Sequence, residues 1–298
     1  MIVAKSNELI KYTLKKTAVA LGSFDAVHKG HIAIINAAVT YARQNDMLSM
    51  VQLFETPPAV LGGAGAINTM EKRIKIIAEL GADIVVVEKF DDKFKSVEYT
   101  DFVTEYLKNR YNAKVVVAGE NYRFGHFAKG NAKNLTELCG QYGIDTEIIK
   151  CLELDGVISS TRIREYIKSG QVEKSSMLMT RPYAVLGQVI HGRELGRSIG
   201  FPTANMDIPD GQIVPKDGVY ASCVKIDEKT FFGITNVGSK PTIECAERNI
   251  ETYIKDFDGN LYGKTIEVEF LKRIRDIKKF DNLSELKEQL AEDKQMLP

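Results

Sequence analysis

Residues 17–43 read TAVALGSFDAVHKGHIAIINAAVTYAR and predict a strand, a glycine-containing turn and a helix in direct succession. The strand is the apolar run Thr17–Gly22, and Ile32–Arg43 has the apolar spacing of an amphipathic helix. Such a unit directs backbone N–H groups and the positive end of the helix toward one point, which suits an anion. The stretch therefore predicts the first unit of an α/β domain, with a phosphate site at its first turn.

The same alternation continues to about residue 152. Further strands are predicted at Leu48–Phe54, Ala82–Glu88, Ala113–Gly119 and Ile144–Leu152, with helices at Met70–Leu80, Asp101–Arg110 and Leu135–Tyr142 between them. Buried β-branched runs separated by helices are typical of a parallel sheet with crossover helices. The first half is therefore predicted to be a doubly wound α/β domain.

The pattern changes after about residue 182. Strands are predicted at Tyr183–His191, Gly218–Ile226, Thr230–Val237, Asn249–Asp256 and Lys264–Lys272, followed by one helix at Leu283–Lys294. Consecutive strands with a terminal helix indicate a small, closed or partly closed antiparallel barrel. We expect domains at residues 1–170 and 183–298, joined by a linker at residues 171–182.

Composition limits the classes of function. Forty basic residues balance forty acidic ones, which argues against a broad basic surface for nucleic acid. The apolar runs are too short to span a bilayer, and residues 1–5 lack the pattern of a signal peptide. The cysteines have no CxxC spacing and are expected to be free thiols: Cys139, Cys151, Cys223 and Cys245. These features predict a cytoplasmic protein.

The turn after the first strand contains two of the four histidines of the chain, His28 and His31, on either side of Gly30. At neutral pH, imidazoles can donate hydrogen bonds or positive charge to phosphate oxygens. A single histidine is more often packed in a core, but this pair, in this turn, favours a phosphate site.

A second polar segment follows the last predicted strand of the first domain, at the expected start of a helix. Its hydroxyl and N–H groups, from Ser159, Ser160 and Thr161, can cap that helix and bind phosphate oxygens. Arg162 and Arg164 can add charge-assisted hydrogen bonds. Taken alone, this pattern also fits a capped helix with two surface arginines.

The second domain has its own phosphate-binding pattern at residues 192–205, GRELGRSIGFPTAN. Glycines allow the backbone to wrap around phosphates, and no Walker A lysine follows them. Thr203 and Asn205 provide neutral oxygen ligands, which suit Mg²⁺ bound to a nucleotide.

Together, these segments resemble the bifunctional riboflavin kinase/FMN adenylyltransferase family. Residues 28–31 and 158–164 are similar to the HxGH and ISSTxxR motifs of nucleotidyltransferases, and residues 119–125 to the GxNFxFG segment of flavin adenylyltransferases. In the second half, residues 192–205, 235–242 and 249–263 resemble the GFPTAN, NVGxxPT and ETHxxDFDGDLYG segments of riboflavin kinases.

The resemblance implies a Rossmann-like nucleotidyltransferase domain, followed by a six-stranded antiparallel riboflavin kinase barrel with a C-terminal helix. It implies that ATP phosphorylates riboflavin to FMN, and that FMN is adenylylated to FAD with release of pyrophosphate. Mg²⁺ would accompany the nucleotide.

The resemblance also assigns roles to residues. Glu251 is the general base of the kinase, and His28 and His31 stabilise charge on the α-phosphate. The resemblance assigns flavin binding to Asn121, Arg123 and Phe124, and it assigns metal binding to Thr203 and Asn205. The nucleotide and its phosphates would be bound by Gly22, Phe24, Gly30, Ser159, Ser160, Thr161, Arg162, Arg164, Gly192, Gly196, Arg197 and Gly200.

The chain departs from the family at three positions. Pro57 stands where the family usually has a histidine, and a proline cannot donate a hydrogen bond. Ala26 stands in place of a glycine, and Tyr253 in place of the histidine of ETHxxDF. The first two changes lie in the adenylylating domain.

Three alternatives remain open at this stage. Only one half of the chain could be active, either the kinase or the adenylyltransferase. The chain could instead be a non-catalytic flavin or nucleotide sensor, although binding alone would not need Glu251. A nucleotidyltransferase with another acceptor is a third alternative, against which the GFPTAN segment argues. No nucleic acid, membrane or protein partner is expected.

Overall fold

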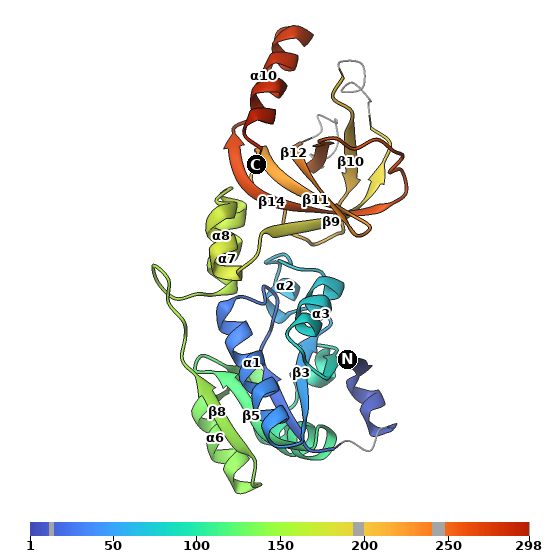
Figure 1. Ribbon diagram of the computed structural model, residues 1–298. Helices are drawn as coiled ribbons and strands as arrows, with labels where there is room; N and C mark the ends of the chain where they lie inside the picture. Colours follow the sequence, from blue (N-terminus) through green and yellow to red (C-terminus); the bar gives the residue numbers. More distant parts are fainter. Residues whose placement is uncertain (12–14, 193–199, 240–247, 298) are drawn as a thin grey trace. The chain divides into compact units, whose positions relative to one another are not determined.

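The computed structural model describes residues 1–11, 15–192, 200–239 and 248–297. The chain forms two compact units, Met1–Ser160 and Thr161–Pro298 (Figure 1). Strands and helices alternate in the first unit, whereas the second consists mainly of consecutive strands, as the sequence predicts.

The first unit is built around a six-stranded parallel sheet with the strand order β1-β4-β3-β2-β5-β8. Its strands are β1 (Ile2–Lys5), β2 (Thr17–Leu21), β3 (Leu48–Phe54), β4 (Ile84–Glu88), β5 (Ala113–Gly119) and β8 (Asp145–Ile149). The longer helices are α1 (Lys29–Gln44), α3 (Met70–Glu79), the π-helix η2 (Phe102–Arg110) and α6 (Ala132–Gln141). The shorter elements are η1 (Ser6–Lys11), α2 (Pro58–Leu61), α4 (Asp92–Lys95), α5 (Tyr99–Asp101), β6 (Arg123–Phe124), η3 (His126–Ala128) and β7 (Gly130–Asn131).

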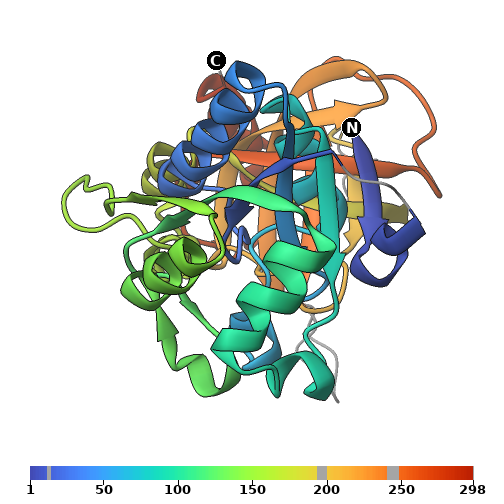
Figure 2. The same cartoon turned by 90° about the horizontal axis from the view of Figure 1, so that it is seen from below.

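Both faces of this sheet are covered by helices (Figures 1 and 2), which explains why every residue of its central strand β2 is buried. In β2, Ala18 and Ala20 pack in a core cluster with residues of α1 and α3. Val19 and Leu21 face the opposite cluster, to which η2 and α6 contribute. The predicted doubly wound domain is confirmed.

The strand β1 is the one element of the sheet that the sequence analysis does not predict. It pairs with β4 at the edge of the sheet, and Ile2 and Val3 remain about half exposed. A four-residue edge strand with this exposure lacks the buried apolar run by which the other strands are found.

The order of the strands reverses at β2. From β2 the chain passes to β3 and β4 on one side, and it then returns to β5 and β8 on the other. In open α/β sheets, ligands bind outside the carboxyl ends of the strands at such a switch point. The segments that leave the carboxyl ends of β2 and β5, residues 22–28 and 120–125, are therefore the candidate walls of a binding site.

The second unit is a closed antiparallel barrel with the strand order β10-β13-β12-β11-β14-β9. Its strands are β9 (Tyr183–Ile190), β10 (Thr203–Asp207), β11 (Gly218–Ile226), β12 (Lys229–Ser239), β13 (Arg248–Ile254) and β14 (Thr265–Arg275). The helices α7 (Ser160–Lys168) and α8 (Val172–Met179) precede the barrel, and α10 (Leu283–Gln295) follows it. The predicted barrel and terminal helix are confirmed, and β10 is a strand that the sequence analysis treats only as part of a phosphate-binding motif.

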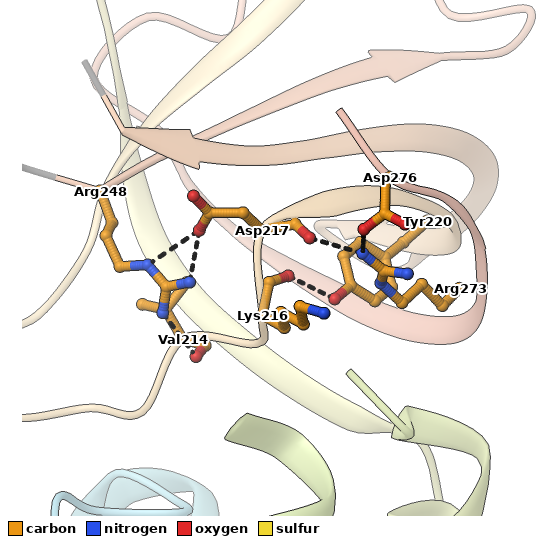
Figure 3. A network of polar contacts seen from close by, with 7 residues as sticks. All are labelled: Val214, Lys216, Asp217, Tyr220, Arg248, Arg273 and Asp276. Atoms are coloured by element: carbon orange, nitrogen blue, oxygen red, sulfur yellow. Dashed lines mark hydrogen bonds and ion pairs between the residues drawn. The ribbon is translucent and has the colours of Figure 1, made fainter. Parts of the chain in front are cut away.

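A polar network fixes the segment that leads into β11 (Figure 3). Four of its backbone carbonyls accept hydrogen bonds from side chains of the barrel: Ile213 from Tyr183, Val214 from Arg248, Lys216 from Tyr220 and Asp217 from Arg273. The Asp217 carboxylate also accepts from Arg248, the first residue of β13. The start of β13 is thereby tied to the start of β11.

The cysteines Cys139, Cys151 and Cys223 are free thiols, as predicted, and Cys245 lies outside the described residues. Burial raises the pKa of the Cys139 thiol to about 12, so that this thiol stays protonated at neutral pH.

Candidate active sites

The first candidate site is the turn between β2 and α1. His28 is the N-cap residue of α1, and its Nδ1 accepts a hydrogen bond from the backbone N–H of His31 at 3.3 Å. The two imidazole rings are stacked, with their centroids 3.7 Å apart, and the edge of Phe24 contacts the His31 ring. Because Nδ1 is the acceptor, the proton of a neutral His28 ring lies on Nε2. The structure thus places both predicted histidines together at the N-terminus of a helix.

The backbone of this turn is strained. Phe24 and Val27 have φ values of 45° and 43°, a region that bulky and β-branched residues rarely occupy, and both residues are fully buried. Such conformations persist only where the surrounding packing fixes them, and they concentrate at functional sites. Ala26 does not share the positive φ, and its methyl group is buried. This position therefore accepts alanine without backbone strain.

The two predicted glycines of the turn make close packing possible. A Cβ atom at Gly30 would lie 3.3 Å from the His28 ring, and one at Gly22 would lie 3.0 Å from the ring of Phe24. Both distances are tighter than ordinary van der Waals contact. Larger residues at these positions would therefore press on the rings that shape the site.

A buried arginine organises the neighbouring segment. Arg73, in the first turn of α3, is 1% exposed and donates hydrogen bonds to the carbonyls of Phe54 and Glu55, each at 2.9 Å. Burial lowers the pKa of its guanidinium, and the negative charge of Asp25 opposes this shift. Asp25 lies in the histidine turn, where its carboxylate accepts from the Ile67 N–H at 3.1 Å. These contacts link the segments that follow β2 and β3.

Neither Asp25 nor Arg73 is among the predicted site residues. The sequence indicates the role of Arg73 only weakly, because this residue lies in a charged run, EKR, and is the only buried charged residue of its helix. Pro57 is the N-cap residue of the short helix α2, and Arg73 donates to the carbonyl of Glu55, two residues before it. At the start of a helix a proline removes no required hydrogen bond. The change from the family's histidine therefore fits the local backbone.

Of the three residues predicted to bind flavin in the loop after β5, two are exposed and one is buried. Asn121 and Arg123 are exposed, whereas Phe124 is 6% exposed and packs in the core against Phe102 and Tyr122. A Cβ atom at Gly119 would lie 3.1 Å from Oδ1 of Asn121 and 3.6 Å from Cδ1 of Ile34, a residue of α1. Asn121 thus lies beside α1, at the same edge of the sheet as the histidine turn.

The predicted segment at residues 158–164 forms the start of α7. The boundary between the compact units falls inside it, so that Ser159 and Ser160 lie in the first unit and Thr161 in the second. Arg162 donates to the Tyr166 hydroxyl at 2.8 Å. Arg164 is only 7% exposed, which corrects the alternative of two surface arginines.

The second candidate site is on the wall of the barrel. Asn205 of β10 lies directly opposite Glu251 of β13, and Glu251 lies opposite Asn236 of β12. These side chains form a polar row on the face opposite to the buried residues Met206 and Ile250. Thr203 lies two positions along β10, on the same face as Asn205, opposite Tyr253.

Contacts hold this row together. Nδ2 of Asn249 donates to Oδ1 of Asn205 at 3.1 Å and to Oε1 of Glu251 at 2.7 Å. A Cβ atom at Gly192 would lie 2.2 Å from Nδ2 of Asn205, so the backbone at Gly192 lies against that amide. Gly200 has a φ of 82°, which glycine adopts readily. Gly196 and Arg197 lie outside the described residues.

The donor atoms of this site suit a magnesium–nucleotide complex. A hydroxyl, an amide oxygen and a carboxylate are hard oxygen ligands, and Mg²⁺ commonly combines one or two protein ligands with phosphate oxygens and water. Within the described ranges, no three His, Cys, Asp or Glu side chains are grouped in a way that could hold a metal ion by themselves. The residues present fit Mg²⁺ that arrives with its nucleotide.

Comparisons with known proteins identify both halves. The family model described as FAD synthetase matches residues 10–162, and the one described as riboflavin kinase matches residues 179–297. A Bacillus subtilis protein is 36% identical over 98% of this chain and 95% of its own length, and an Escherichia coli K12 protein is 33% identical over 92% and 89%. Both are named bifunctional riboflavin kinase/FMN adenylyltransferase. The chain belongs to this family.

A solved structure from Streptococcus pneumoniae, described as a macrolide-efflux protein, shares the fold. It is 32% identical, with a TM-score of 0.90 over 99% of this chain and 98% of that chain. In the part of the present chain that the structure describes, no helix has the length and apolar character needed to cross a membrane.

The role of Arg73 can be tested by stability. The variant Arg73→Met keeps an apolar stem but leaves the carbonyls of Phe54 and Glu55 without their donor. We expect the free energy of unfolding to fall by about 1–3 kcal/mol, the cost of an unsatisfied buried group. Urea titration followed by circular dichroism measures this change. The matched variant Arg123→Met, at an exposed position, should stay within about 0.5 kcal/mol of the parent; equal losses in both variants would contradict the assignment.

Proposed function

We propose that this protein phosphorylates riboflavin to FMN in its second unit and adenylylates FMN to FAD with residues of the histidine turn. ATP is the donor in both reactions. The observation that carries the proposal is that one chain combines two candidate sites. The stacked pair His28 and His31 lies at a helix N-terminus, and the cluster of Asn205, Asn249 and Glu251 lies on a barrel wall.

In the adenylylation step, a phosphate oxygen of FMN attacks the α-phosphorus of ATP, and pyrophosphate leaves. His28, His31 and the N-terminus of α1 stabilise the negative charge that develops on the α-phosphate, without a covalent enzyme intermediate. Gly22, Phe24 and Gly30 give the turn its shape. The resemblance assigns the remaining phosphates to Ser159 and Ser160 of the same unit. The other members of that motif, Thr161, Arg162 and Arg164, begin the second unit.

The flavin of this step is bound by the loop after β5. Asn121 and Arg123 are exposed and can reach a ligand, and Phe124 supports the loop from the core. Adenylylation proceeds without an imidazole at position 57, because the two histidines of the turn remain to stabilise charge.

In the kinase step, Glu251 accepts the proton of the ribityl hydroxyl while that oxygen attacks the γ-phosphorus, and ADP leaves. Thr203 and Asn205 would hold Mg²⁺, and Gly192 and Gly200 would lie against the phosphates. Gly196 and Arg197, assigned to the same role by the resemblance, lie outside the described residues. When bound, Mg²⁺ neutralises charge on the transferred phosphoryl group. The paired position of Asn205 and Glu251 supports this assignment.

Two further assignments stay proposals. Residues 171–182 form the linker, most of which is the helix α8. The protein works in the cytoplasm, which agrees with its free thiols.

The proposed function is tested by chromatography of flavins. Purified protein is incubated with ATP and Mg²⁺ and either riboflavin or FMN, with oxidised and chemically reduced flavin in parallel. We expect FMN followed by FAD from riboflavin, and FAD from FMN. If riboflavin gives FMN and no FAD is formed, only the kinase is active. If FMN gives FAD but riboflavin gives no FMN, only the adenylyltransferase is active. The absence of any flavin product would favour a sensor.

The histidine turn predicts a selective loss. His31→Ala should lower the rate of FAD formation from FMN by about 10²- to 10³-fold, the usual effect of removing one group that stabilises transition-state charge. FMN formation from riboflavin should be unchanged, because His31 lies in the other unit. Initial rates of both reactions on one preparation decide the matter, and a parallel loss of both would refute independent sites.

Glu251 predicts the opposite selectivity. Glu251→Ala should lower kinase turnover by about 10²- to 10⁴-fold, the usual contribution of a general base, while FAD formation from FMN continues. Steady-state rates with riboflavin measure this effect. A folded variant with full kinase turnover would remove Glu251 from the role of base.

A further inference from the structure

Asn249 is the second residue of β13, and its side-chain amide lies between the two groups assigned to phosphoryl transfer. One N–H hydrogen of Nδ2 is directed at Oδ1 of Asn205 and the other at Oε1 of Glu251. Asn249 is 7% exposed and Asn205 is 6% exposed, so this contact is largely shielded from water. An amide nitrogen has two hydrogens, and both are used here.

These bonds fix the orientation of the Asn205 side chain. An asparagine amide can turn over, which exchanges its oxygen and its nitrogen. The Nδ2 group of Asn249 can only donate hydrogen bonds, so the atom of Asn205 that faces it must be the acceptor, Oδ1. The Nδ2 atom of Asn205 then faces Gly192. Within the described part of the chain, no other side chain hydrogen-bonds to Oδ1 of Asn205 or to the Glu251 carboxylate.

The strand that carries Asn249 is itself anchored. The preceding residue, Arg248, donates to the Asp217 carboxylate and to the carbonyl of Val214, at 3.0 Å for the latter (Figure 3). The backbone of Asn249 also pairs with Gly238 of β12. The amide is therefore held by a fixed backbone position on a regular strand, as a positioning group requires.

We propose that Asn249 is a positioning residue for the kinase reaction. It holds the Glu251 carboxylate in one rotamer toward the hydroxyl to be phosphorylated, and it presents the Asn205 oxygen to the magnesium–nucleotide complex. The inference rests on the proposed kinase function. Groups that orient a metal ligand or a base in this way commonly contribute 10- to 100-fold to metal affinity or activity.

The test compares Asn249→Ala with Asn249→Ser and with the control Gln188→Ala. Serine keeps one donor, whereas alanine keeps none. Gln188 is an exposed amide of the same barrel that donates to a backbone carbonyl, so its loss matches the change in chemistry away from the site. Because the substituted residues lie in the second unit, circular dichroism and thermal unfolding of each variant report whether its barrel is folded.

For Asn249→Ala we expect kinase kcat to fall by about 10- to 100-fold and the Mg²⁺ concentration for half-maximal rate to rise by about 10-fold. The KM for riboflavin should change little, Asn249→Ser should recover part of the loss, and Gln188→Ala should behave as the parent. Calorimetric titration of ADP in the presence of Mg²⁺ should show a correspondingly weaker Kd for Asn249→Ala. Parent-like kcat and Mg²⁺ dependence in that variant would overturn the proposal.

A double-mutant cycle separates positioning from a general structural role. In the Glu251→Gln background, at saturating Mg²⁺ and ATP so that the contact to Asn205 does not limit the rate, Asn249→Ala should cause little further loss of kcat, because the base that it orients is already absent. An undiminished loss there would contradict action through Glu251. If the parent protein formed no FMN, the proposed function would fail, and the ADP titration would still decide the inference: an unchanged Kd in Asn249→Ala would overturn it.

Discussion

Nδ1 of His28 accepts a hydrogen bond from the backbone N–H of His31, and this contact shapes the candidate adenylylation site. It caps a helix whose first N–H groups would otherwise lack partners, and it brings the two imidazoles into a stack. The turn that leads to it contains Phe24 and Val27 with positive φ, at an expected cost of about 1–3 kcal/mol each. Burial of both side chains offsets this cost. The strain persists because the cap and the core fix the turn from both ends.

Both candidate sites also depend on a glycine, which has no side chain. Gly30 lets the backbone of α1 approach the His28 ring, and Gly192 lets the chain pass directly against the Asn205 amide. In each case glycine allows close approach to a side chain to which a role in catalysis or metal binding is proposed. The sites differ in how that side chain is held. His28 is held by a strained turn, whereas Asn205 lies on a regular strand and is oriented by Asn249.

Local patterns in the sequence predict much of this structure. The bounds of β3, β5 and β11 agree with the prediction, because each is a segment rich in apolar residues between turn signals. The strand β10, with the sequence TANMD, carries no such run and is defined by its neighbours β9 and β13. The strand β1 is likewise defined by a distant partner, β4. Periodicity does not report pairing between segments that are far apart in the chain.

The candidate sites show the same limit. Motifs predict that His28, His31, Asn205 and Glu251 carry chemistry, and the structure brings the members of each pair together. Motifs do not distinguish a ligand-facing residue from a supporting one, and Phe124 proves to be buried in the core. Arg73 and Asn249 are missed because their importance depends on hydrogen bonds to other segments or strands. The spacing of residues in the sequence does not predict hydrogen bonds between segments that are far apart in the chain.

The three departures from the family fall where the local structure accepts them. Ala26 has no positive φ, and Pro57 precedes the first turn of a helix, where no N–H donor is required. Tyr253 packs beside Phe201, and the ammonium group of Lys294 lies over its ring. None of the changes introduces backbone strain among these residues. Their effects should therefore be sought in how the sites bind ligands and stabilise charge, rather than in whether the units fold.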